Sequence, residues 1–178
     1  MTEHVFWLTS RSAGIVALLA SSASVGLGLL MAGRMIRGKG AELRSIHEAL
    51  SLATMAAIVV HAGALVFDGY VNLSPAEVTI PFLGDYAPLW TSLGIACGWA
   101  LIALGLSYYA RARIGVARWR QLHRWTVFVW VLSIAHALGE GTDAGRLWFL
   151  AAAGIVIVPA ALLLAIRHFP SSPTEASR

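Results

Sequence analysis

Four histidines lie in apolar parts of this chain and repeat with nearly the same spacing. His47 and His61 are 14 residues apart, and His123 and His136 are 13 residues apart. The second two frame the apolar stretch "HRWTVFVWVLSIAH". Ionisable side chains inside a membrane are costly and usually have a partner or a function. The doubled pattern therefore predicts a functional site.

The segments that carry these histidines are predicted to be membrane-spanning helices. Of the 178 residues, 58% are hydrophobic and 12% are charged, which is far from the balance of a soluble domain. A helix needs about 20 apolar residues to cross a bilayer. Five segments between charged residues meet this need: Arg11 to Arg34, Glu48 to Asp68 extended upstream through His47, Asp85 to Arg111, Leu122 to Gly139, and Leu147 to Ile166, with a kink expected at Pro159.

The sequence thus predicts an all-α, five-helix transmembrane bundle that forms one domain over residues 1–170, followed by a disordered cytoplasmic tail at 171–178. Its net charge of +4 comes from basic residues grouped between the apolar runs, which favours membrane orientation over nucleic-acid binding. The single cysteine, Cys97, lies in an apolar run and has no partner for a disulfide within the chain.

The positions of the basic residues predict the orientation of the helices. Positive charge concentrates in cytoplasmic loops, and here it fills the first and third connections, with Arg34, Arg37, Lys39, Arg44, Arg111, Arg113, Arg118, Arg120 and Arg124. The N-terminus is then outside and the C-terminus cytoplasmic. In the outer connection between the second and third spans, Ser74-Pro75-Ala76-Glu77 has the pattern of a capping box and predicts a short interfacial helix, which would cover the site as a lid.

With this topology the second and fourth spans run in the same direction, so the histidines form two cross-helix pairs. His47 lies at the level of His123, and His61 lies at the level of His136. At a rise of 1.5 Å per residue the two levels are about 20 Å apart, too far for four ligands to share one zinc ion. A haem needs only two axial imidazoles, and this six-coordinate arrangement favours electron transfer. The pattern predicts two stacked haems.

Two other interpretations of the histidines remain open. A membrane histidine can simply form a hydrogen bond between helices, worth about 1 kcal/mol. Four histidines could also line a proton or metal-ion conduit without haem, although the only acids near the second span, Glu48 and Asp68, lie at its ends. The spacing itself raises a difficulty, because 13 residues turn an ideal helix by about 140° away from the starting face. The fourth span is therefore expected to be tilted or distorted, or else the two haems lean to different flanks of it.

The paired histidines and the sequence "WRQLHRW" at the start of the fourth span resemble the ferric reductase-like transmembrane domain family. This family includes ferric reductases, NADPH oxidases and the haem subunit of the periplasmic methionine sulfoxide reductase system. The resemblance implies that His47 and His123 ligate an inner haem b, and that His61 and His136 ligate an outer one. Family members usually have six helices, so this chain resembles the bundle without its first helix.

Many family members continue into a flavin and nicotinamide domain, but this sequence has no Gly-rich dinucleotide fingerprint and no evident flavin site. We therefore expect electrons to come from a separate reductase, a quinol or a diffusible reductant. A quinol-linked cytochrome b of the superoxide oxidase type, which shares the haems but differs in its donor, stays open as an alternative. They would leave to an external acceptor such as ferric iron, oxygen or a partner protein. Arg44 and Arg124 are expected to hold the propionates of the inner haem, and Arg146 is expected to serve the outer site.

Overall fold

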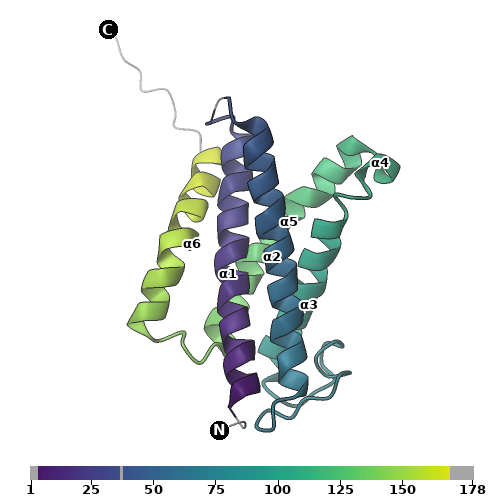
Figure 1. Ribbon diagram of the computed structural model, residues 1–178, viewed down its shortest axis with the longest axis vertical. Helices are drawn as coiled ribbons and strands as arrows, with labels where there is room; N and C mark the ends of the chain where they lie inside the picture. The colour runs from purple at the N-terminus through teal and green to yellow at the C-terminus, as the bar shows by residue number, and fades with distance from the viewer. Residues whose placement is uncertain (1–3, 37, 169–178) are drawn as a thin grey trace.

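The computed structural model describes residues 4–36 and 38–168, and over these residues the chain is helical throughout, without strands. The tail expected at 171–178 lies outside the described residues. Six helices are formed: α1 (Val5–Ala32), α2 (Gly40–Val66), α3 (Pro88–Leu106), α4 (Arg111–Ile114), α5 (Val116–Glu140) and α6 (Leu147–His168). The all-α prediction is therefore confirmed (Figure 1).

Four of these helices, α1, α2, α3 and α6, are long and apolar enough to cross a membrane. This indicates a multi-pass membrane protein, as expected from the sequence. The fourth predicted span is also formed, as the 25-residue α5, but His123, Arg124 and His136 make it less apolar than the other four. Its crossing of the bilayer stays a prediction. Pro159 lies inside α6, which continues as one helix on both sides of it.

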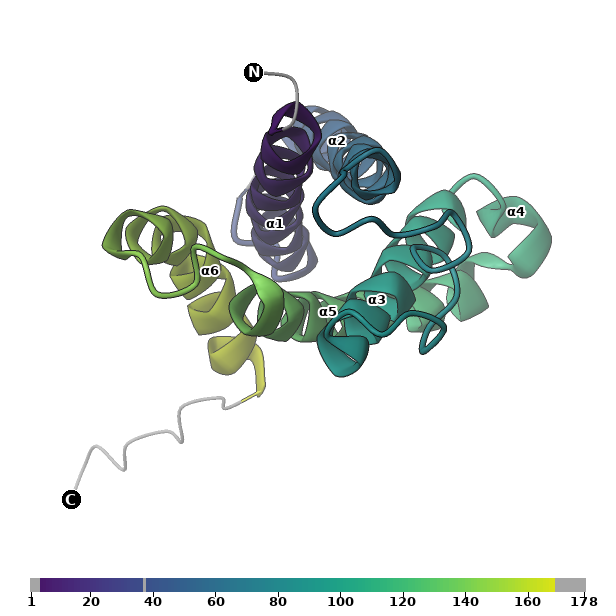
Figure 2. The same ribbon diagram turned by 90° about the horizontal axis from the view of Figure 1, so that it is seen from below.

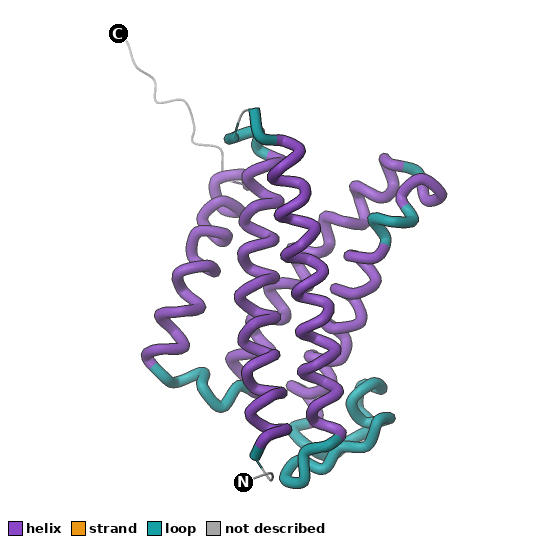
Figure 3. The backbone as a smooth tube through the Cα atoms, in the orientation of Figure 1, coloured by secondary structure: helices purple, strands orange, loops and turns teal. Residues whose placement is uncertain are grey.

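The helices form a bundle in which α1 packs against α2, α5 and α6, and α3 packs against α5 and α2 (Figure 2). The short α4 and the connection before α2 lie at one end of the bundle, whereas the long connection between α2 and α3 lies at the other end (Figure 3). Within the described residues, the backbones of α2 and α5 make no close approach to each other. The two helices that carry the four histidines are thus held together through α1 and α3.

α5 crosses the bundle at an inclination, from beside α4 at its start to beside α6 at its end (Figures 1 and 2). It is a single continuous α-helix. Because an inclined helix presents different faces to its neighbours at its two ends, His123 and His136 can both face α2 despite their spacing. Of the expected alternatives, the structure shows the tilt and no distortion of the helix (Figures 1 and 2), and a leaning of the two haems to different flanks stays a prediction.

The crossing of α5 over α1 is fixed near its middle by Trp130. This side chain is 1% exposed, and its indole N–H donates a hydrogen bond to Ser22 Oγ over 2.9 Å. Ser22 is itself fully buried and donates to the Leu18 carbonyl, so its hydroxyl is satisfied on both sides. Val25 and Ala160 pack with Trp130 and join α6 to this core.

The connection between α2 and α3 forms the predicted capping box but not the predicted interfacial helix. Ser74 N–H donates to the Glu77 carboxylate and Glu77 N–H donates to Ser74 Oγ, and the bonds from Ser74 hold the pKa of Glu77 below its usual value. The residues that follow form turns. The Trp99 indole donates to the Thr79 carbonyl, and Phe82 N–H donates to Ser92 Oγ, so the connection is bound to α3.

We expect the Trp130–Ser22 bond to stabilise the fold. Ser22→Ala would leave the indole N–H buried without an acceptor and should lower the free energy of unfolding by about 1 kcal/mol. Unfolding in mixed detergent micelles, followed by circular dichroism, measures this difference. Trp125→Phe is the matched control, because Trp125 lies on the same helix and is 61% exposed. A Ser22→Ala protein as stable as the wild type would contradict the role given to this bond.

Candidate functional site: two histidine pairs between α2 and α5

The structure brings the four histidines together in the two pairs expected from their spacing. The ring centroids of His47 and His123 are 6.1 Å apart, with an interplanar angle of 80°. Those of His61 and His136 are 6.5 Å apart, with an angle of 74°. Among the described residues, no group of three or more His, Cys, Asp or Glu side chains gathers in a form that could hold a metal ion. Each pair therefore offers two imidazoles.

These separations match two imidazoles on opposite sides of one metal ion. Imidazole ring atoms lie about 1.15 Å from the centroid, given ring bonds of about 1.35 Å. With metal–nitrogen bonds of about 2.0 Å, the two centroids should be about 6.3 Å apart. Edge-to-face aromatic pairs also occur at such distances. The hydrogen bonds of the Nδ1 atoms are therefore needed to distinguish the two arrangements.

In three of the four histidines, Nδ1 lies at a main-chain carbonyl of a neighbouring helix. His61 Nδ1 is 2.8 Å from the Ser10 carbonyl oxygen, His47 Nδ1 is 3.0 Å from that of Ser24, and His136 Nδ1 is 2.9 Å from that of Trp90. A carbonyl oxygen only accepts, so a hydrogen bond to it requires the proton on Nδ1. Nδ1 of His61 and of His47 also lies 3.0 and 3.1 Å from the hydroxyls of Ser10 and Ser24, which in this tautomer act as acceptors. The lone pair is then left on Nε2. Metal-ligating histidines commonly have this arrangement, which sets the tautomer and the ring orientation.

A glycine follows each of these carbonyls by four residues. The side chain of residue i+4 in a helix lies over the carbonyl of residue i, and a glycine there leaves the carbonyl open. An added Cβ at Gly14 would lie 3.0 Å from His61 Nδ1, and one at Gly28 would lie 3.3 Å from His47 Cε1. At Gly94 it would lie 2.4 Å from His136 Cε1. We call each such carbonyl and its glycine a carbonyl recess.

Ser10–Gly14 and Ser24–Gly28 are the same motif repeated after 14 residues on α1, which equals the spacing of His61 and His47 on the antiparallel α2. Sequence analysis did not single these residues out. The repeat of Ser-x-x-x-Gly at the interval of the histidines is the signal that could have identified them.

The fourth histidine, His123, has a different environment. Its ring stacks on the indole of Trp119, with centroids 5.2 Å apart and an angle of 26°. Its Nδ1 is buried and has no hydrogen-bond partner among the described residues. This ring is therefore oriented by packing on Trp119 and not by a carbonyl recess.

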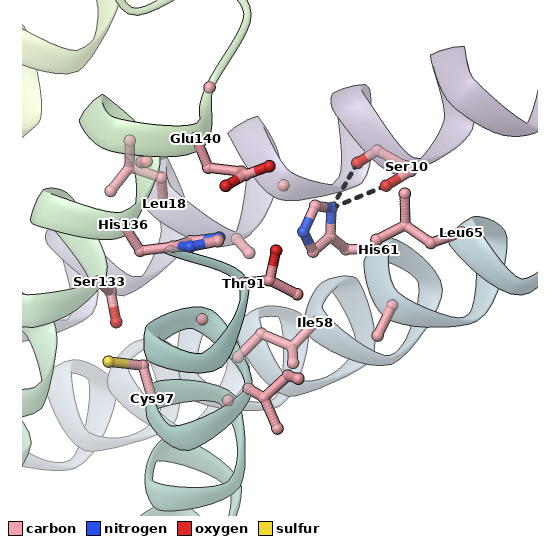
Figure 4. A pocket seen from close by; sticks show the side chains of 18 of the residues that line it. Ser10, Leu18, Ile58, His61, Leu65, Thr91, Cys97, Ser133, His136 and Glu140 are labelled. Atoms are coloured by element: carbon pink, nitrogen blue, oxygen red, sulfur yellow. Dashed lines mark hydrogen bonds between the residues drawn. The ribbon is translucent and has the colours of Figure 1, made fainter. Parts of the chain in front are cut away.

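A cavity of about 480 Å³ adjoins the pair formed by His61 and His136, with a mostly apolar lining contributed by α1, α2, α3 and α5. Figure 4 shows the two imidazoles on different sides of this space, with Ser10 bonded to His61 and with Glu140 nearby. Tyr86 also lines the cavity, and burial, reinforced by the charge of Glu140, raises the pKa of its phenol. The volume is typical of ligand sites, which are apolar with few polar groups.

The three arginines predicted to serve the cofactors, Arg44, Arg124 and Arg146, are all exposed. Arg146 does not line the cavity, whereas Arg11 does. The Arg11 guanidinium forms a two-bond ion pair with the buried carboxylate of Asp143. This pair joins α1 to the connection between α5 and α6. Sequence analysis used Arg11 only to mark the start of the first span.

Comparisons with known proteins leave the resemblance seen in the sequence as a prediction. No protein-family model, no curated protein and no solved structure matches this chain. The function must therefore be argued from the histidine pairs and their surroundings.

We expect Arg11, rather than Arg146, to stabilise the mouth of this cavity. Arg11→Gln would leave the buried Asp143 carboxylate without its cation. It should lower the free energy of unfolding by about 2 kcal/mol, less than for a fully buried pair, because the Arg11 side chain is 32% exposed. Arg146→Gln is the matched control and should change it by less than about 0.5 kcal/mol. Equal effects of the two substitutions, measured by unfolding in detergent, would contradict this assignment.

Proposed function

We propose that this protein is a diheme b-type cytochrome that carries electrons across a cell membrane. The observation that supports it is the presence of two imidazole pairs, each with the ring separation of two axial ligands. Three of the four rings also have Nδ1 engaged and Nε2 left for a metal. His47 and His123 would hold the inner haem b, and His61 and His136 the outer one.

A haem held by each histidine pair would supply one-electron oxidation and reduction. The chain's part is to hold the rings in place and to exclude water. The carbonyl recesses at Ser10, Ser24 and Trp90 orient three rings, and Trp119 orients the fourth. The mostly apolar lining of the cavity would disfavour water beside His61 and His136.

The direction of transfer follows from the proposed topology. The connections at the α4 end, together with the first parts of α2 and α5, carry most of the chain's basic residues, which favours a cytoplasmic position for this end. His47 and His123 are nearer this end, and His61 and His136 are nearer the opposite one. Electrons would enter from a separate reductase or a quinol, and would leave outside to ferric iron, oxygen or a partner protein.

Haem content of the purified protein and of its histidine variants tests the proposal. We expect two noncovalent haems per chain in the wild type, by extraction and by reduced-minus-oxidised spectra. His47→Ala and His123→Ala should each lose the same haem, and His61→Ala and His136→Ala should each lose the other. His4→Ala is the control and should retain both.

A purified protein without haem, or with covalently attached haem, would contradict the proposal. Proton or metal-ion flux through liposomes containing the haem-free protein would instead favour a histidine-lined conduit. For the haem-containing protein, the rate of reduction by a flavin reductase with NADPH, compared with the rate by a quinol, identifies the class of donor.

A further inference from the structure

The two histidine pairs differ in how their Nδ1 atoms are bound. In the outer pair, His61 and His136 both lie in carbonyl recesses, on α1 and α3. In the inner pair only His47 does, whereas Nδ1 of His123 has no acceptor among the described residues. The pairs are therefore alike in ring separation and unlike in hydrogen bonding.

The cause of this difference can be read along α3. The recess that holds His136 consists of Trp90 and Gly94. At the interval of 13 residues that separates His136 from His123, the position beyond Trp90 is Ala103, and the residue four further on is Ser107. At an interval of 14 the two residues are Leu104 and Tyr108, so no glycine opens either carbonyl. Ser107 Oγ already donates to the Leu104 carbonyl over 2.6 Å. The repeat that α1 completes at both levels is thus completed by α3 at only one.

Hydrogen bonding at Nδ1 changes the ligand itself. An imidazole that donates its Nδ1 proton to a carbonyl is a more basic donor through Nε2. A more basic axial ligand stabilises ferric iron more than ferrous iron and so lowers the reduction potential of a haem. Two such ligands at the outer site should lower its potential more than the single one at the inner site.

The charges around the two sites act in the same direction. The side chain of Glu140 lines the cavity beside His136, and its Oε2 is buried without a hydrogen-bond partner among the described residues. When ionised, this carboxylate favours ferric iron. The charge of Arg11, in the same cavity, is compensated by Asp143. At the inner site, the cation of Arg124 is next to His123 and the anion of Glu48 is next to His47, so these two charges offset each other.

We infer that the two haem sites have different reduction potentials because their histidines are bound differently: the outer haem has the lower reduction potential and the inner haem the higher one. This inference rests on the proposed function. An electron that enters the protein would then reside mainly on the inner site, and transfer to the outer site would be uphill. The protein would release electrons outward only when an acceptor removes them.

A redox titration of the purified diheme protein, followed by absorbance, tests the inference. We expect two one-electron steps at different potentials. His136→Ala should retain only the inner haem, which titrates at the higher of the two wild-type potentials. His123→Ala should retain only the outer haem, which titrates at the lower one. The opposite assignment, or two steps at the same potential, would overturn the inference, whereas a protein without haem would overturn the proposed function instead.

Glycine substitutions test the physical cause separately. Gly14→Ala places a methyl group against His61 and should raise the potential of the lower step alone, and Gly28→Ala, against His47, should raise the higher step alone. Gly26→Ala is the matched control on the same helix, because its Cβ meets only Ala160 at 3.6 Å. Gly94→Ala would place its methyl group closest to a histidine ring and could cause loss of the outer haem. In that case Gly14→Ala still tests the outer site. Unchanged potentials in Gly14→Ala and Gly28→Ala would overturn the carbonyl recess as the cause.

Discussion

The arrangement depends on a second hydrogen bond to carbonyls that already belong to a helix. Such a carbonyl bonds to the N–H four residues on and has one further lone pair for an imidazole. The imidazole can reach it only where the residue above has no side chain. This requirement places glycine at residues 14, 28 and 94, and it sets how closely α1 approaches α2. The distances between helices and the directions of three rings therefore have one common cause.

The same helix, α1, also carries the contact that sets the path of α5. Ser22 lies between the two serines of the recesses, and it binds Trp130 between the two histidines of α5. α1 thus binds α2 at Ser10 and Ser24, and it binds α5 at Ser22. α2 and α5 need no direct contact for their histidines to face each other, and the space between them stays available.

Much of this could be predicted from the sequence, because the signals were local or periodic. Apolar length predicted the helices, and equal spacing predicted which histidines meet. The tilt of α5 could be predicted only as one of several alternatives. The spacing of residues gives their directions around one helix but not the angle at which that helix crosses its neighbours. The ion pair of Arg11 and Asp143 joins residues 132 positions apart, and nothing near either residue indicates the other. The capping box at Ser74 was a correct local prediction. The residues that follow it form turns and are bound to α3 by a bond that Trp99 donates and a bond that Ser92 accepts.

The lack of direct packing between α2 and α5 has a consequence for biogenesis. α1 and α2 form one antiparallel hairpin, and α3 and α5 form another contact pair, joined to the first mainly through α1. The ribosome completes the first hairpin long before it reaches His136, so each histidine pair has only one member during much of synthesis. Both pairs are completed only once α5 has docked on Ser22. A prosthetic group bound at that stage would contact both the α1–α2 hairpin and the α3–α5 pair and would stabilise their association.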